Sequence, residues 1–257
     1  MRIRQLFTGL AVLSALSLTV AGCGADGDSP SGSTGSAPAA TSAAPADPTD
    51  ELAAAARKLN DTTMKMKLES AGSHSTGSLD PQRKLGEMTM TVAAAGRELK
   101  IQVRTIGTDV YLQADGMPGV EAGKWLKIAG DRLAGSSFDV FPESDPAGTQ
   151  RILDAISDIK KDGPGKFSGT IDLTKTSTNK AAAASLGEKF KALPFTATVD
   201  DQGRLTSTTI DVSPAEPSAG KTTATYSDFG TAVTVEPPPA GDTVPAPDDV
   251  VKLLTGG

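Results

Sequence analysis

Few side chains in this sequence have the type and spacing needed for catalysis. The chain has one histidine, His74, and it lies in Gly72–Gly77, which we expect to be an exposed turn between strands. A Ser-His-acid triad would have to use His74, and the Gly-x-Ser-x-Gly motif that often carries the nucleophile is absent. We therefore predict that the chain is not an enzyme, although a glycosidase carboxylate pair, which need not be adjacent in sequence, stays open.

Two other matches to a catalytic pattern are weak. Ser157-Asp-Ile-Lys160 and Ser177-Thr-Asn-Lys180 fit the Ser-x-x-Lys pattern of penicillin-binding enzymes. The Lys-Thr-Gly and Ser-Asp-Asn motifs that accompany this pattern are missing, so both matches are interpreted as chance.

Metal, cofactor and nucleic-acid binding are not expected either. Zinc sites use cysteine or histidine, of which the chain has one each, and Asp200-Asp201 is typical of a turn rather than a calcium loop. The net charge of −6, with no dense Lys/Arg patch, gives no electrostatic reason to bind nucleic acid.

The one cysteine has a clear chemical context. Cys23 follows the small residues Ala21 and Gly22, which end an uncharged run from Leu6 to Val20 behind Arg2 and Arg4. This layout is typical of a secretory signal peptide, and the small-small-Cys ending is the lipobox of bacterial lipoproteins. We predict that residues 1–22 are removed and that lipidated Cys23 anchors the protein to the extracytoplasmic face of the cell membrane. The alternative is an ordinary signal peptide, with Cys23 a leftover thiol.

Residues 23–49 form a second segment, which should be a tether. Gly24 to Pro48 consists mainly of Gly, Ser, Ala, Pro, Thr and Asp, and such a composition buries too little apolar surface to order itself. The folded domain is therefore expected to span residues 50–257.

The first half of this domain predicts a helix and then strands. A short helix is expected from Glu51 to Leu59. Strict alternation of apolar with polar residues then predicts strands that each have one apolar face. Close spacing and glycine-containing turns favour an antiparallel meander of these strands. They are Met64–Glu69, Met88–Val92, Leu99–Arg104, Val110–Ala114 and Lys124–Ile128.

The second half predicts two helices inserted between strands. Ile152, Leu153, Ile156 and Ile159 recur at helical spacing after a possible cap at Thr149, and a second helix is expected from Thr178 to Leu193. The remaining expected elements are strands Phe167–Leu173, Phe195–Val199, Leu205–Val212, Thr222–Phe229 and Ala232–Val235, and a helix Asp248–Leu254. The predicted fold class is α+β, a long antiparallel sheet curled into an open half-barrel around the two inserted helices.

Three segments carry a resemblance to a known family. Asp109–Leu112, Gly123–Lys127 and the stretch from Tyr226 to Pro238 resemble the LppX/LprG/LprA/LprF lipoproteins of actinobacteria. The resemblance implies a half-barrel related to the LolA/LolB carriers, with an apolar cavity between sheet and helices. It also implies binding of lipids or lipoglycans and their movement within the cell envelope.

Two functions are therefore weighed. The first is a membrane-anchored lipoprotein that carries a lipid or glycolipid in an apolar cavity, with the loop Ser136–Phe141 at the cavity mouth. The alternative is a tethered interaction or sensor protein with a filled core. The alternative for the loop is that Phe138 and Phe141 both pack back into the core. A cavity of several hundred Å3 would favour the carrier. The predicted lipid-binding side chains are Met64, Met66, Leu68, Met88, Met90, Val92, Leu99, Ile101, Val103, Leu112, Ile152 and Ile156.

Overall fold

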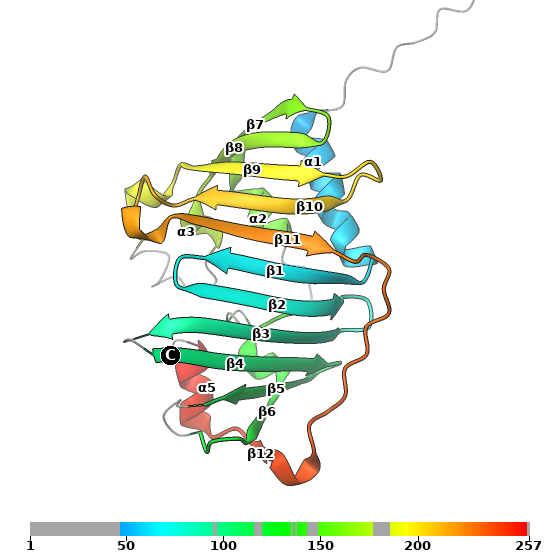
Figure 1. The fold of residues 1–257 in the computed structure, drawn as a ribbon, viewed down its shortest axis with the longest axis vertical. Coiled ribbons are helices and arrows are strands. Elements are labelled where there is room, and N and C mark those ends of the chain that lie inside the picture. Colours follow the sequence, from blue (N-terminus) through cyan, green and yellow to red (C-terminus); the bar gives the residue numbers. More distant parts are fainter. Residues whose placement is uncertain are drawn as a thin grey trace, which may run out of the picture. The chain divides into compact units, whose positions relative to one another are not determined.

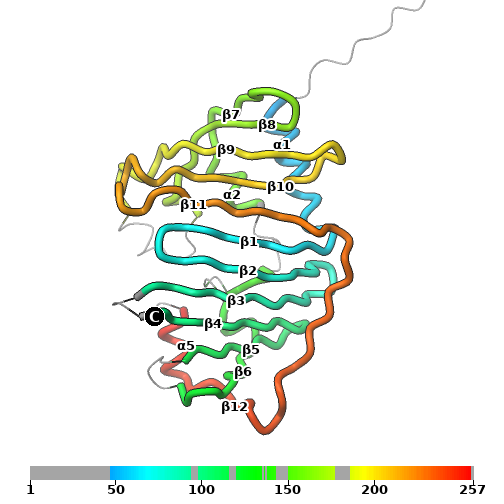
Figure 2. The backbone as a smooth tube through the Cα atoms, viewed as in Figure 1, coloured from blue at the N-terminus to red at the C-terminus, as the bar shows by residue number. Residues whose placement is uncertain are grey.

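Alternating apolar and polar residues build one long sheet, which dominates the computed structural model (Figures 1 and 2). The structure describes residues 47–94, 97–115, 120–134, 136, 138–142, 149–176 and 186–255. The expected signal peptide 1–22, Cys23 and most of the tether lie outside the described residues.

The sheet has twelve strands. They are β1 Met64–Ser70, β2 Ser73–Asp80, β3 Leu85–Ala94, β4 Arg97–Ile106, β5 Asp109–Ala114, β6 Trp125–Ala129, β7 Ile156–Gly163, β8 Lys166–Ile171, β9 Leu193–Val199, β10 Leu205–Asp211, β11 Lys221–Ser227 and β12 Thr243–Pro245. The described α-helices are α1 Pro48–Arg57, α2 Thr149–Ala155, α3 Leu173–Thr176 and α5 Asp248–Thr255. Short 3-10 turns are η1 Lys58–Asp61, η2 Gly130–Leu133, η3 Glu188–Phe190, η4 Pro217–Ala219 and η5 Ala240–Asp242.

Two meanders meet in the middle of this sheet. Strands β1 to β6 are neighbours in chain order, and so are β7 to β11. The two halves join where β1 pairs antiparallel with β11. Strand β12 adds to the other side of β6 in parallel, so the sheet is open, with β12 and β7 at its edges. The predicted α+β class with one long sheet is thereby confirmed.

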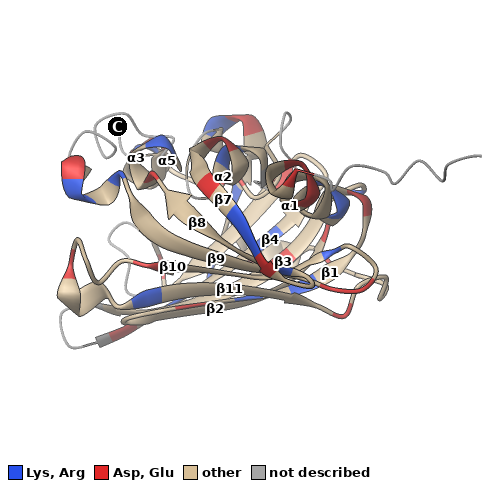
Figure 3. Cartoon of the chain, turned by 90° about the horizontal axis from the view of Figure 1, so that it is seen from above, with Lys and Arg blue, Asp and Glu red and all other residues tan. Residues whose placement is uncertain are grey.

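The described α-helices lie on one face of the sheet (Figure 3). Helix α1 begins where the side chain of Asp47 accepts a hydrogen bond from Thr49 N, and Pro48 suits the first turn because it needs no amide partner. The helix buries Leu52, Ala55 and Ala56. Since apolar residues also alternate on the strands, the helix-facing side of the sheet becomes the core. The other side carries most of the polar residues of the strands, although Tyr111 and Trp125 are also buried there.

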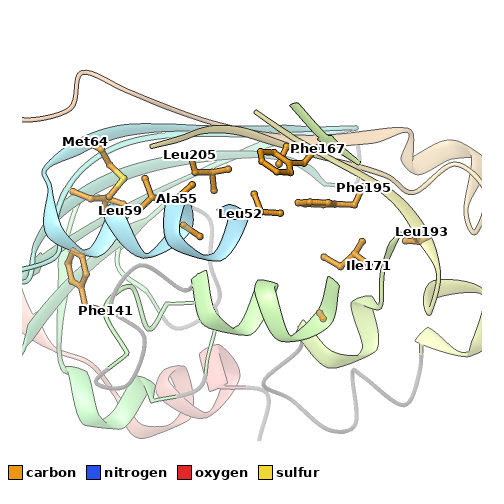
Figure 4. Packing of buried hydrophobic residues seen from close by; sticks show 14 of the residues in the cluster. Leu52, Ala55, Leu59, Met64, Phe141, Phe167, Ile171, Leu193, Phe195 and Leu205 are labelled. Carbon is orange, nitrogen blue, oxygen red and sulfur yellow. The ribbon is translucent and has the colours of Figure 1, made fainter. Parts of the chain in front are cut away.

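Two hydrophobic clusters fill the space between helices and sheet. One lies under α1 and α2 and includes Leu59, Phe167 and Phe195 (Figure 4). The other lies under α5 and η2 and includes Leu112 and Leu126. The two clusters share a contact residue, Val140, which comes from the loop before α2 and packs against both.

A long connection after β11 runs past the ends of several strands (Figure 1). We call residues 228–242 the strap. Gly230 N donates to Thr63 O at 3.0 Å, Arg83 Nη2 donates to Val233 O at 2.8 Å, and Arg104 Nη1 donates to Glu236 O at 3.2 Å. These contacts fix the strap against the first half of the sheet before it delivers β12 to β6.

Four local predictions are wrong. Ser73–Gly77, expected within a turn, belongs to β2, because the chain reverses within Ala71-Gly72 alone. Ala232–Val235 is not a strand but part of the strap. Strand β12 and its parallel pairing with β6 were not predicted. Leu193 begins β9 instead of ending a helix from Thr178, and residues 178–185 of that expected helix lie outside the described residues.

A further error concerns the helix from Thr149. Helix α2 ends at Ala155, and Ile156 and Ile159 belong to strand β7. The pairing of β7 with β8 shifts between Ser157 and Lys160, and Asp158 has φ +55°. A bulge inserts an extra residue, so two isoleucines three apart can both pack against the α1 cluster, as helical spacing would also allow.

Candidate functional site

The ten strand-borne residues predicted to bind lipid all lie on the helix-facing side of the sheet. The pairing register shows this directly. Met66 is opposite Gly77 of β2, Gly77 is opposite Met88 of β3, and Met88 is opposite Val103 of β4. Val103 is in turn opposite Leu112 of β5. The alternation in sequence therefore predicted correctly which side chains share a face.

Burial divides this set into two groups. Met64, Ile101, Val103 and Leu112 are at most 7% exposed and behave as ordinary core residues. The remaining six are only partly buried, which indicates that helices cover the central strands incompletely. They are Met66, Leu68, Met88, Met90, Val92 and Leu99.

Ile152 and Ile156 line a small pocket between α1, α2 and the sheet. Leu52, Phe195 and Tyr226 contribute to the same lining, and the pocket volume is about 20 Å3. That is room for roughly one water molecule, so the core is essentially filled at this position. Tyr226 is partly buried here, and this burial raises the pKa of its phenol to about 12.

A much larger pocket, of about 930 Å3, lies at the strand ends near the β4–β5 turn. We call it the strand-end pocket. Its lining comes from the β2–β3 turn, the β4–β5 turn, the segment from β6 to Ala134, the loop 138–142 and α2. None of the twelve predicted lipid-binding residues lines it. The sequence signal that pointed here was the pair of phenylalanines in the loop expected at a cavity mouth.

Part of the strand-end pocket lining is apolar. The apolar lining residues include Val110, Phe138, Val140 and Phe141. Phe141 is only 7% exposed and belongs to the cluster under α1. Its ring lies over Gly86 of β3, where a Cβ atom would meet two of the ring carbons at 3.1 Å. Because Gly86 has no side chain, the Phe141 ring can pack directly against the sheet and so position the loop.

The pocket lining also carries charges of both signs. Lys84, Arg151, Asp109, Asp131 and Asp139 line the pocket. Asp109 pairs with Lys127 at 2.7 Å, and this hydrogen bond raises the pKa of Lys127. Arg151 and Asp139 also have interaction partners.

Two of the lining charges are uncompensated. Lys84 and Asp131 make no side-chain ion pair or hydrogen bond within the described part of the chain. The strand-end pocket is therefore amphiphilic, since its lining combines apolar side chains with one free cation and one free carboxylate.

Other chemistry is not assembled among the residues that the structure describes. His74 is exposed on β2, and Ser157 Oγ lies 2.8 Å from Thr170 Oγ1. No three His, Cys, Asp or Glu side chains in the described ranges gather as they would around a metal ion. Within the same ranges, no helix has the length and hydropathy to cross a membrane.

Fold and pocket together define a class of protein: an open, one-sided α+β sheet with an amphiphilic pocket at its strand ends. A scan of the chain against models of known protein families finds no match, and a search of curated proteins finds none either. Function must therefore be argued from the geometry.

Proposed function

We propose that the protein is a lipid-anchored lipoprotein whose domain binds the acyl chains of a lipid or lipoglycan and carries it within the cell envelope. The observation that carries this proposal is the strand-end pocket, with its volume of about 930 Å3. Small-molecule sites typically enclose several hundred Å3 and combine apolar walls with a few polar groups. The pocket has both properties.

The partly exposed side chains of the central strands support the same function. Six apolar residues on the helix-facing side, among them Met66 and Met90, keep surface that packing has not removed from water. An acyl chain that covered such surface would gain roughly 0.8 kcal/mol per buried methylene group. Methionine suits this role because its flexible thioether adapts to ligands of different shape.

The proposal includes the membrane anchor, the shape of the sheet and the absence of catalysis. Lipidated Cys23 holds the protein at the extracytoplasmic face of the membrane, and the open sheet serves as a half-barrel around its helices. Binding by apolar burial needs no catalytic group or cofactor, in keeping with the weak catalytic signals of the sequence.

Filling the strand-end pocket tests this function. Ala134 is exposed and lines the pocket, so Ala134→Trp adds a ring where there is room. We expect uptake of a fluorescent diacylglycerol probe to fall at least about fivefold, with little change in melting temperature, because no core residue is displaced. Ala240→Trp is the matched control, since Ala240 is exposed and does not line the pocket. Wild-type protein that takes up no probe, or unchanged uptake by Ala134→Trp, would contradict the proposal.

Met90→Trp tests whether the acyl chain extends along the central strands. Met90 is partly buried and packs against the cluster under α5. If ligand occupies this face, Met90→Trp lowers probe uptake at nearly unchanged stability. If the face is packed solidly, the larger ring costs about 1–3 kcal/mol.

A tethered interaction protein with a filled core is the second candidate. The observation in its favour is the pocket of about 20 Å3 under α1, which leaves no room for an acyl chain among Leu52, Ile152 and Phe195. Strong destabilisation by Met90→Trp, together with no probe uptake by the wild type, would favour this candidate.

A further inference from the structure

We infer that the strand-end pocket selects an uncharged, hydroxyl-bearing headgroup, as on a neutral glycolipid, over a phosphate. The inference rests on the proposed function and specifies the polar part of its ligand.

The charge balance of the pocket is the first argument. Its lining has two cations, Lys84 and Arg151, and three carboxylates, Asp109, Asp131 and Asp139. The ion pair with Lys127 compensates Asp109, and both Arg151 and Asp139 have interaction partners. The charged lining side chains that make no ion pair or hydrogen bond within the described part of the chain are one ammonium group and one carboxylate, whose charges cancel.

The ammonium group of Lys84 and the carboxylate of Asp131 together suit a ligand with hydroxyl groups better than a ligand with a phosphate. Phosphate sites usually combine arginine with several N–H donors, and each added carboxylate opposes the bound anion. A sugar hydroxyl can donate to the Asp131 carboxylate and accept from the Lys84 ammonium, so both groups are used. Thr108, exposed at the β4–β5 turn, adds another hydroxyl to the lining.

The apolar part of the lining gives a place to the acyl part of the ligand. Val110 lines the pocket from β5 and Phe138 from the loop, whereas Lys84 belongs to the β2–β3 turn and Asp131 to η2. The headgroup would lie against Lys84 and Asp131, with the first methylene groups against the apolar side chains. One ligand would thereby contact both kinds of lining residue.

Two fluorescent lipids with identical acyl chains test the inference. We expect the full-length protein to bind monoglucosyl diacylglycerol at least about fivefold more tightly than phosphatidylglycerol, a difference of about 1 kcal/mol in binding free energy. Asp131→Arg replaces the opposing carboxylate by a cation and should reverse this preference. Asp201→Arg makes the same charge change at an exposed turn that does not line the pocket, and it should leave the preference unchanged.

The outcomes separate the inference from the function on which it rests. Binding of neither lipid overturns the proposed function itself. Equal binding of both lipids, or tighter binding of phosphatidylglycerol, overturns the headgroup inference and leaves lipid binding standing. An unchanged preference in Asp131→Arg also overturns it, because the free carboxylate would then have no part in selection.

Discussion

Tyr226 places a phenol beside an almost wholly apolar pocket under α1 and α2. The pocket lining has one other hydroxyl residue, Thr208, and the Tyr226 hydroxyl makes no hydrogen bond within the described part of the chain. Burial alone raises its pKa to about 12 from the ordinary value near 10. The folded protein therefore resists losing this proton, whereas the unfolded chain does not.

Stability should depend on pH through Tyr226. Below pH 10 the phenol is protonated in both states and its effect is constant. Between pH 10 and 12 the unfolded chain binds fewer protons than the folded protein, so unfolding becomes easier as pH rises. At pH 11 the loss should reach about 1.4 kcal/mol.

Urea denaturation of wild type and Tyr226→Phe at several pH values measures this loss. The variant should match the wild type at pH 7 and be less sensitive to alkali, because it has no phenolic proton to lose. Parallel stability curves for the two proteins between pH 9 and 11 would show that Tyr226 ionises equally readily in the folded and unfolded states.

For single residues, the sequence predicted on which face of the sheet each side chain lies, but not how much of that side chain is exposed. Alternation placed Met64 and Met66 on one face, and the structure agrees, because successive side chains of a strand point to opposite sides. Yet Met64 is 2% exposed and Met66 is partly buried. That difference depends on which helix and loop lie above each residue, and no local pattern encodes it.

Among the elements, strand β3 and the loop 138–142 depend on each other. Gly86 is opposite Thr105 of β4 and opposite Leu79 of β2, and the Phe141 ring occupies the space that a side chain at Gly86 would need. The loop also forms a wall of the strand-end pocket. A single small residue on a strand therefore determines the position of that wall.

Gly86→Ala should displace the loop. The new methyl group would lie 3.1 Å from Phe141 ring carbons and from Leu79 Cδ2, which is too close for an undisturbed contact. We expect a loss of about 1–3 kcal/mol in the free energy of unfolding.

Gly241→Ala is the matched control, because a methyl group there meets nothing within 4 Å. Combining Gly86→Ala with Phe141→Leu should recover part of the loss, since the smaller side chain makes room. A Gly86→Ala protein as stable as the control would mean that Phe141 does not need this space.

The sequence predicted the elements in which apolar and polar residues alternate regularly. It did not predict the elements that contain a bulge or that depend on pairing with a distant part of the chain. Strands β3 to β5 follow strict alternation, and their positions were correct. Strand β7 carries Ile156 and Ile159 at a spacing of three because of its bulge, and this spacing imitates a helix. Strand β12 exists only because the strap carries Thr243–Pro245 to β6. The strand-end pocket was missed for a similar reason, since five separate segments form it.

At the scale of the whole domain, the strap connects strand β11 in the middle of the sheet to strand β12 at its edge. In the β2–β3 turn, Arg83 donates a hydrogen bond to Val233 O of the strap, and it also forms an ion pair with Asp80 at 2.5 Å. The Asp80 side chain is only 8% exposed, although Arg83 itself is 59% exposed. Arg83 thus both holds the strap and compensates a buried carboxylate.

Arg83→Ala should lower the free energy of unfolding by about 1–3 kcal/mol, less than for a fully buried pair because Arg83 is largely exposed. Arg132→Ala is the comparison, since its pair with Asp248 is exposed on both sides and should contribute at most about 1 kcal/mol. Chemical denaturation of both variants measures the difference. Equal losses in the two variants would mean that neither the strap nor Asp80 depends on Arg83.

The pairing of β1 with β11 has a consequence for the order in which this protein acquires its structure. Within each meander every strand pairs with its neighbour in chain order, so the intervening connections are much shorter than the chain between β1 and β11 and close at lower entropic cost. The central pairing must instead wait for nearly the whole domain to be synthesised, so we expect it to limit the folding rate, as non-local strand pairs generally do. Until then β1 presents an unpaired edge, and the charges of Lys65, Lys67 and Glu69 along it discourage association with other chains.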